Sequence, residues 1–340
     1  MSEAHPPVWP RAGGAPVARA RLREAPEDFQ VEEILGFSPA GSGQHVLLQV
    51  RKRGANTQWV ARRLAQLAGL PPRAVGYAGL KDRHAVTCQW FSVDLAGRAA
   101  PDWGCLAAEG ITVLQAVPHD RKLRHGAVRA NRFRIRLRRV EGDRGALAAA
   151  LSRLATRGTP NYFGPQRFGG GNLRQAAALL LEGRTVADRF RRGIYLSTAR
   201  AWLFNKVLAA RVVAGNWDRA LPGDVLMLDG RHSLFPCEAP DEAIQRRIGT
   251  GELHPTGPLW GEGRALCSGP AAALEGAALA ADGDWCAALA AQGLKAQRRA
   301  LRVMPRELTW DFADGELEVS FTLAAGSYAT SVLREVVDWD

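Results

Sequence analysis

The chain has 340 residues, and its 45 Lys and Arg against 34 Asp and Glu give a formal net charge of +11 and a pI near 10.1. This length favours two domains, and the charge favours a polyanion partner such as nucleic acid, although a basic surface that keeps a protein soluble is the plainer interpretation. The five cysteines are dispersed without CxxC pairs, and no apolar run suits a signal peptide or a membrane span, so we expect a cytoplasmic protein rather than a secreted or membrane one.

The first half of the chain mixes strand and helix patterns. Its first two dozen residues are rich in Pro, Ala and Gly and are expected to form a loosely ordered lead-in. The segments that follow predict strands at 45–51, 86–93 and 132–138, a helix over 58–68 that starts at Asn56-Thr57, and a second helix over 143–156.

The strand over 132–138 alternates strictly, with Phe133, Ile135 and Leu137 on one face and four arginines on the other. An aromatic beside cations suits an RNA enzyme that stacks an extruded base, although a Phe on an alternating strand is more often a core residue. Asn131 could hydrogen-bond a base edge or shape a turn.

The second half changes character at Gly158-Thr159-Pro160, which breaks the preceding helix. The segment beyond is mostly helical and rich in Ala and Leu, and near Met304-Pro305 the strand pattern returns. We predict helices over 197–213, 240–249, 284–301 and 328–337, and strands over 224–228 and 316–323. The middle therefore reads as a domain inserted between two parts of an α/β domain.

Several common catalytic signatures are missing. The sequence has no GxxxxGK[ST] loop, no GxSxG elbow, no HExxH and no paired CxxC, and its seven histidines show no metal spacing. The glycines of 169–171 suit a plain helix start better than a phosphate site. We therefore expect no metal and no nucleotide cofactor, and chemistry carried by carboxylates, bases or the substrate itself.

The strongest local feature is Lys81-Asp82-Arg83-His84. Neighbouring cations favour the ionised form of Asp82, which suits a nucleophile or a base at neutral pH. On spacing alone the alternative is preferred, a surface turn in which Asp82 pairs locally. Gly76 and Gly79 permit a tight loop, and the strand from Val86 gives that loop a rigid support.

The string Gly76–Gln89 resembles the signature of the TruD family of tRNA pseudouridine synthases. The likeness extends over nearly the whole chain and includes 26–33, 43–45, Asn56-Thr57, 126–133, 161–169, Phe204-Asn205, 326–330 and 332–335. The compact length is similar to the bacterial branch, which modifies uridine 13 of certain tRNAs. Leu80, Pro165 and Tyr328 depart from residues found in some members and leave only fine substrate preference in doubt.

The resemblance implies a mixed-sheet α/β pseudouridine-synthase core at 1–157 plus 304–340, interrupted by a mostly helical TRUD domain at 158–303. It implies that Asp82 is the catalytic carboxylate, acting on C1′ or on a sugar proton, and that Phe133 stacks the flipped base while Asn131 helps to orient it. Lys81 would bind phosphate or hold Asp82 ionised, and Glu27 would support the site, although an acid in such a loop is more often a cap. The expected partner is tRNA, with no cofactor, no membrane and a monomeric chain.

Two other functions stay open. A non-catalytic RNA-binding protein or chaperone would use the same basic surface, but it would not require the carboxylate of Asp82. A base-removing glycosidase would also place a carboxylate near C1′, although such enzymes usually rely on a pair of acids and no second acid is evident in this motif.

Overall fold

The computed structural model describes residues 8–124, 126–231 and 233–339. The chain forms two compact units. One, the sheet unit, comprises Ala18–Gly142, Arg306–Gly326 and Asp338–Asp340, and the other, the helical unit, comprises Met1–Val17, Asp143–Pro305 and Ser327–Val337. The boundaries between the units fall at 17/18, 142/143, 305/306, 326/327 and 337/338, and the division at 157/158 and 303/304 stays a prediction. No helix in the described ranges is long and apolar enough to span a membrane.

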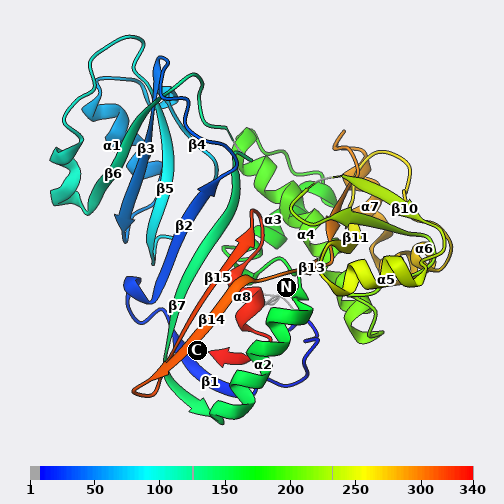
Figure 1. Ribbon diagram of the computed structural model, residues 1–340. Coiled ribbons are helices and arrows are strands. Elements are labelled where there is room, and N and C mark those ends of the chain that lie inside the picture. Colours follow the sequence, from blue (N-terminus) through cyan, green and yellow to red (C-terminus); the bar gives the residue numbers. More distant parts are fainter. Residues whose placement is uncertain (1–7, 125, 232, 340) are drawn as a thin grey trace. The chain divides into compact units, whose positions relative to one another are not determined.

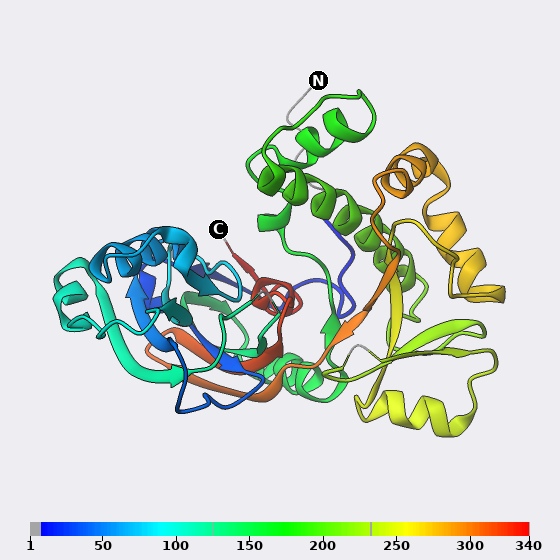
Figure 2. The ribbon, with the colours of Figure 1, turned by 90° about the horizontal axis from the view of Figure 1, so that it is seen from above.

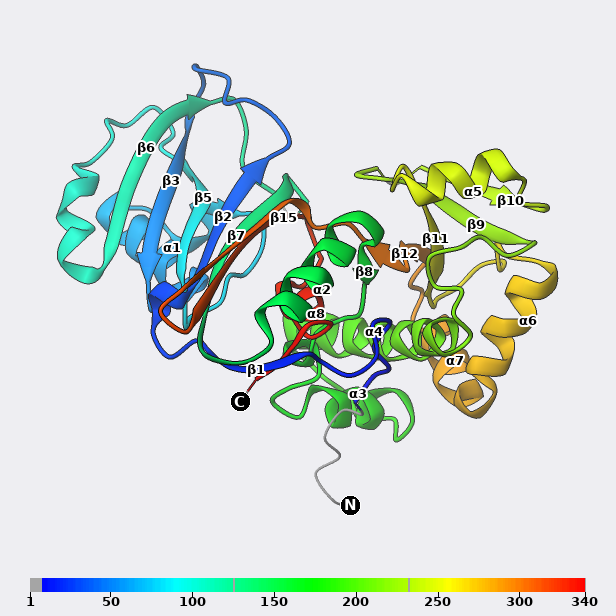
Figure 3. The same cartoon turned by 60° about the horizontal axis from the view of Figure 1, so that its bottom comes forward.

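The sheet unit is built on one large mixed sheet with the order β14-β15-β7-β2-β5-β3-β6, and Figure 3 shows the strands from β6 to β15 side by side. Strand β1 also pairs with β7, and β4 with β5; β2 and β5 run parallel, whereas the other registered neighbours run antiparallel. The strands are β1 (Ala18–Leu22), β2 (Phe29–Leu35), β3 (His45–Arg53), β4 (Val75–Tyr77), β5 (Val86–Asp94), β6 (Ile111–His119), β7 (Val128–Gly142), β14 (Arg306–Ala313) and β15 (Glu316–Ala324). The predicted α/β class with a mixed sheet is confirmed.

Helix α1 (Thr57–Leu67) covers one face of this sheet (Figure 2). Its apolar side buries Val60 and Leu64 against Leu48 of β3 and Phe91 of β5. Short 3₁₀ turns complete the unit: η1 (Pro26–Asp28), η2 (Pro72–Ala74) and η3 (Trp103–Glu109). The strands predicted at 45–51, 86–93, 132–138 and 316–323 and the helix at 58–68 are confirmed to within a few residues, because each has an apolar face that this core buries.

The helical unit packs helices around the 25-residue α4 (Arg189–Val213), which buries Leu203, Phe204 and Leu208 (Figure 1). A four-stranded antiparallel sheet, β10-β9-β11-β12, lies in the same unit. Besides α4, the elements of the helical unit are α2 (Arg144–Arg157), β8 (Thr159–Pro160), η4 (Pro165–Arg167), α3 (Asn172–Leu180), β9 (Asp224–Leu228), β10 (Leu234–Cys237), α5 (Glu242–Gly249), β11 (Leu253–Leu259), α6 (Gly269–Ala278), η5 (Ala280–Asp282), α7 (Gly283–Ala290), β12 (Gln297–Ala300), β13 (Arg302–Val303) and α8 (Ala329–Leu333). A last strand, β16, covers Val337–Trp339.

Several predicted elements of this unit were wrong in extent. The helix predicted from Ser197 begins at Arg189, because the Asp188 carboxylate accepts from the backbone N–H of Phe190 and caps the helix earlier. The helix predicted over 284–301 ends at Ala290, and Gln297–Ala300 instead pairs with β11 as a strand. The helix predicted over 328–337 is only the five-residue α8.

The predicted loose lead-in is wrong from Val8 onward. The Trp9 ring stacks on Tyr162 at 5.9 Å between centroids, and Ala18–Leu22 is already a strand. Trp9 also meets the Trp202 ring edge to face at 5.5 Å, so this side chain has packing partners that composition does not reveal. The first seven residues of the predicted lead-in lie outside the described residues.

Candidate active site

The candidate site is organised by two rows of residues that cross the main sheet. In the first row, Lys52 of β3 pairs with Thr87 of β5, Thr87 with Val31 of β2, Val31 with Phe133 of β7, and Phe133 with Phe321 of β15. Paired residues on neighbouring strands point their side chains to the same face. The row therefore aligns a lysine, a threonine and two aromatic rings on one face of the sheet.

The second row, one pleat further along, is unusually polar for a buried surface. It contains Gln89 of β5 next to Val50 of β3, and Asn131 of β7 next to Glu33 of β2. Gln89, Glu33 and Asn131 are all buried, as are Lys52 and Thr87 of the first row. Buried polar side chains are costly unless they are bonded, so a concentration of them on one sheet face indicates a functional site more than a core.

The loop that carries Asp82 joins β4 to β5 and is fixed by side chains of this face. The Gln89 amide donates to the Gly79 carbonyl at 2.7 Å, and the Lys81 backbone N–H donates to Thr57 Oγ1 at 3.0 Å. The Thr57 hydroxyl in turn donates to Gln89 Oε1 at 2.9 Å. Thr57 was predicted only as part of a helix start; its side chain instead links α1 to this loop.

Lys81 is held by a buried carboxylate. Its Nζ lies 2.6 Å from Glu33 Oε1, and the other oxygen of Glu33 accepts from the backbone N–H of Trp90 at 2.8 Å. Lys81 was expected to bind phosphate or to keep Asp82 ionised. Its ion pair is with Glu33, so its direct contact in this structure anchors the loop to β2.

The Asp82 carboxylate has a different cation. Asp82 Oδ2 lies 2.8 Å from a guanidinium nitrogen of Arg23, and the Asp82 side chain remains 43% exposed. A guanidinium N–H and a carboxylate oxygen form a charge-assisted hydrogen bond, which is shorter and stronger than a neutral one. The site therefore presents an anionic oxygen to solvent while one cation orients it, as a nucleophile or a base requires.

Arg23 connects Asp82 to the aromatic residues of the first row. Its guanidinium carbon lies 4.0 Å from the centroid of the Phe29 ring, and the Phe29 ring meets the Phe133 ring edge to face at 6.1 Å. Arg23 adopts φ +65°, a conformation that is strained for a side chain of this size. Arg23 has no sequence signal for this contact, because only the fold brings it next to a residue 59 positions away.

The two residues expected to meet the base lie on the same face of β7. Phe133 is 7% exposed, with its ring 5.6 Å from that of Phe321, and Asn131 is 8% exposed. Within the described part of the chain the amide oxygen of Asn131 has no hydrogen-bond partner. A buried acceptor without a partner is costly, and a substrate N–H would satisfy it.

Glu27 lies apart from these contacts. It is in η1, where its carboxylate pairs with Arg53 at 2.5 Å and its backbone carbonyl accepts from the Gln30 amide at 3.1 Å. The hydrogen bond from Arg53 lowers the pKa of Glu27. None of the contacts described for Glu27 is with the Asp82 loop.

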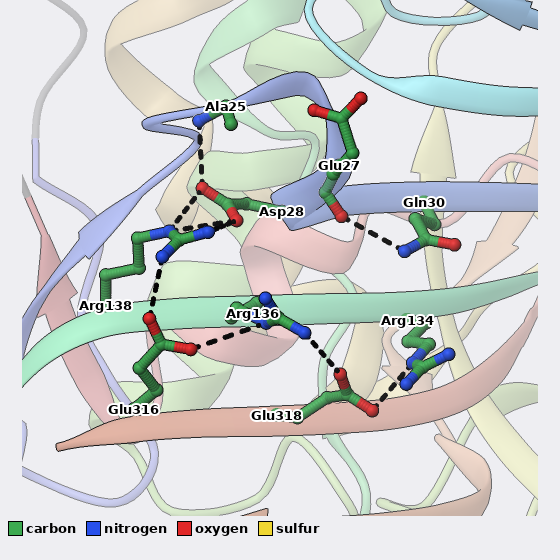
Figure 4. A network of polar contacts seen from close by, with 9 residues as sticks. All are labelled: Ala25, Glu27, Asp28, Gln30, Arg134, Arg136, Arg138, Glu316 and Glu318. Atoms are coloured by element: carbon green, nitrogen blue, oxygen red, sulfur yellow. Dashed lines mark hydrogen bonds and ion pairs between the residues drawn. The ribbon is translucent and has the colours of Figure 1, made fainter. Parts of the chain in front are cut away.

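Four arginines of β7 form a ladder of ion pairs on the opposite, exposed face: Arg132, Arg134, Arg136 and Arg138. Figure 4 shows the pairs of the last three. Arg134 pairs with Glu318 at 2.6 Å, and Arg138 pairs with Asp28 at 2.8 Å. The remaining pairs join Arg132 to Glu32 and Glu307, Arg136 to Glu316 and Glu318, and Arg138 to Glu316. Burial alone would raise the pKa of Asp28, but the hydrogen bonds from Arg138 and from the Ala25 backbone N–H, together with the charges of Arg138 and Arg136, outweigh burial and lower that pKa. These arginines are already paired with carboxylates.

Comparison with known proteins agrees with this architecture. The family model described as tRNA pseudouridine synthase D (TruD) matches residues 14–187 and 184–336. The tRNA pseudouridine synthase D of Methylococcus capsulatus is 51% identical over 336 residues, covering 97% of this chain and 94% of that protein, and the one of Nitrosococcus oceani is 48% identical over 340 residues, covering 98% and 95%. A solved structure assigned to TruD of Methanosarcina mazei shares the fold, with a TM-score of 0.68 at 21% identity, 97% of this chain and 96% of that chain being covered. Because both the family model and these relatives span nearly the entire chain, it belongs to the TruD family of tRNA pseudouridine synthases, as its sequence motifs predicted.

Proposed function

We propose that this chain converts uridine 13 of certain tRNAs to pseudouridine, with Asp82 as the catalytic carboxylate. The observation that carries the proposal is the half-exposed Asp82 carboxylate, held at 2.8 Å by Arg23, which itself stacks on the aromatic cluster that contains Phe133. Membership of the TruD family supports the reaction class and the tRNA substrate. The position in the tRNA comes from the resemblance to the bacterial branch.

The reaction needs one anionic group and a place for a rotated base. The bond between uracil N1 and ribose C1′ breaks, the base turns, and C5 bonds to C1′; C5 loses its proton and N1 gains one, so the product is an isomer. Asp82 acts either by attacking C1′ or by abstracting a sugar proton. The target uridine leaves its stack at a cost of about a few kcal/mol.

The remaining residues divide into groups that hold the base and groups that hold the loop. Phe133 stacks the flipped uracil, and the unpaired amide oxygen of Asn131 accepts a hydrogen bond from a ring N–H. Lys81, anchored to Glu33, keeps the Asp82 loop in place. Glu27 supports the site through Arg53, the neighbour of Lys52 on β3.

The direct test is Asp82→Asn, assayed by tritium release from C5 of tRNA labelled with [5-³H]uridine and by chemical mapping of position 13. We expect turnover to fall at least about 10²-fold, because the amide is neither a base nor a nucleophile of comparable strength. Binding of tRNA should change by less than about 3-fold, since one side chain that acts on the reacting bond contributes little to holding the tRNA backbone.

The matched control is Asp120→Asn, which changes an exposed aspartate whose ion-pair contacts are with His119 and Arg121. It should retain the wild-type rate. Undiminished turnover in Asp82→Asn would remove Asp82 from the mechanism. Free uracil in the wild-type reaction would identify a glycosidase, and tRNA binding without any pseudouridine would identify a binding protein.

A further inference from the structure

Lys52 is a buried lysine next to the Asp82 loop that the proposed chemistry does not use. It lies on β3, its side chain is 0% exposed, and its Nζ donates to the Ala55 carbonyl at 2.7 Å and to the Asp82 carbonyl at 3.4 Å. Among the described residues no carboxylate lies within 4.0 Å of this ammonium, so its direct hydrogen-bond partners are neutral backbone oxygens. An ammonium in such surroundings is one of the least favourable groups to bury.

The charges around Lys52 come from two neighbouring elements. Burial lowers the pKa of Lys52 from 10.5 to about 8; Lys81 in the loop lowers it too, while Asp82 in the loop and Glu33 on β2 act against that shift. Thr87, its partner on β5, carries no charge. A methionine would fill a similar volume without this cost. A lysine at this position is therefore unfavourable for folding, which points to a role at the neighbouring Asp82.

Other anchors of the loop leave the backbone of Asp82 unheld. Gln89 binds the Gly79 carbonyl, Thr57 binds the Lys81 N–H, and the Gly54 N–H binds the Ala85 carbonyl at 3.2 Å. Within the described contacts, Lys52 is the group that reaches the backbone of Asp82 itself. It joins that peptide to the turn after β3, where Ala55 is part of the buried core.

We propose that Lys52 is a positioning residue for Asp82. The Lys52 ammonium donates hydrogen bonds to both the Asp82 carbonyl and the Ala55 carbonyl, and so fixes the backbone that presents the Asp82 carboxylate. This inference rests on the proposed function of Asp82. A displacement of about 1 Å at a reacting group costs on the order of 10²-fold in rate. A neutral amine donates more weakly than an ammonium, so the hold on Asp82 weakens as Lys52 loses its proton.

The experiment compares Lys52→Met with Lys295→Met, which changes an exposed lysine paired with Glu262. Single-turnover tritium release is measured with saturating tRNA from pH 6.5 to 9.5. The wild-type rate should fall as pH rises through about 8, following the pKa of Lys52. At pH 7, Lys52→Met should lower the rate on the order of 10²-fold. It should remove the decline near pH 8 and change the Kd for tRNA by less than about 3-fold, because Lys52 is buried. Lys295→Met should behave as wild type.

Thermal stability separates positioning from a structural role. Because the pKa of Lys52 is lower in the folded chain than its ordinary value of 10.5, the protonated lysine opposes folding at pH 7, and this penalty disappears as pH rises from about 8 towards 10.5. Lys52→Met should therefore melt at or above the wild-type temperature at pH 7, and its advantage should shrink at higher pH. A lysine kept for stability would give the reverse, a lower Tm at pH 7.

The outcomes distinguish the two proposals. Full activity in Lys52→Met with an inactive Asp82→Asn would overturn the positioning role and leave the proposed function intact. Activity in Asp82→Asn would overturn the proposed function. If Lys52→Met does not fold, the wild-type profile decides: a decline centred near pH 8 supports the positioning role, and a rate that stays flat to pH 9.5 refutes it.

Discussion

The Phe133 side chain has two roles under the proposed function: it packs in the core, and it stacks the flipped uracil. Its ring lies between those of Phe29 and Phe321, so a change there alters both the core and any stacked base. Phe133→Leu keeps most of the apolar volume and should cost less than about 1.5 kcal/mol of unfolding free energy. If the ring stacks the uracil, the same change should lower kcat at least about 10-fold with little change in tRNA affinity.

The matched variant for this prediction is Phe321→Leu, because Phe321 of β15 pairs with Phe133 of β7 and belongs to the same aromatic cluster. It should lose similar stability in denaturant melts and keep its turnover. Equal losses of turnover in the two variants would show that Phe133 acts only as a core residue.

Single residues of the site differ in how far sequence could identify them. Asp82 and Phe133 fall in motifs whose order along the chain matches a family, so they could be predicted. Arg23 could not, since its ion pair with Asp82 depends on the arrangement of β1 and the loop before β5. Lys52 has no signal at all: it lies just beyond the strand predicted over 45–51, between two arginines, and only the fold shows that it is buried.

At the scale of elements, the alternation of apolar residues and arginines in β7 predicted the strand, but it did not show what the arginines contact. The alternation correctly placed four arginines on one face, but a sequence cannot show that η1, β2, β14 and β15 supply carboxylates opposite them. An arginine that is already paired with a carboxylate neutralises little phosphate charge, and so displaces few counterions from the RNA when the RNA binds. The ladder therefore contributes to joining strands more than to binding phosphate.

This interpretation predicts the behaviour of the double variant Arg134→Gln, Arg136→Gln. The slope of log Kd against log salt for tRNA should equal that of the wild-type protein, because the two guanidiniums already face Glu316 and Glu318. A slope reduced by about 1 per arginine would show instead that they meet phosphates. The unfolding midpoint serves as the control and should shift little, since exposed ion pairs contribute about 0–1 kcal/mol each.

The predicted boundaries of helices and strands were wrong where a capping residue or a strand distant in sequence determines the true boundary. Asp188 caps α4, which therefore begins at Arg189, eight residues before the Ser197 that looked like a start; Asp and Ser are both suitable N-caps by type. Gln297–Ala300 lacks an apolar alternation of its own and is a strand only because β11 pairs with it. Conversely, β3, β5 and β15 carry apolar faces that indicate strands without knowledge of their partners.

At the scale of the whole molecule, the net charge of +11 and the paired state of the β7 ladder have to be considered together. A basic protein attracts tRNA over a distance, but the cations that contact phosphate must be ones whose charge is not already neutralised. The excess of 45 basic over 34 acidic side chains leaves such cations elsewhere on the surface. Under the proposed function, recognition of the tRNA backbone and chemistry at Asp82 are then carried by separate sets of residues.

The separation predicts how salt affects the two steps. Between about 50 and 200 mM salt the Kd for tRNA should rise at least about 10-fold, which corresponds to two or more neutralised phosphates, while the single-turnover rate at saturating tRNA stays constant. A tRNA without uridine at position 13 should show the same salt slope, because phosphate contacts do not depend on the target base. Fluorescence anisotropy and tritium release measure the two quantities. A Kd that is insensitive to salt would mean that shape and base contacts, rather than the positive charge of this chain, hold the tRNA.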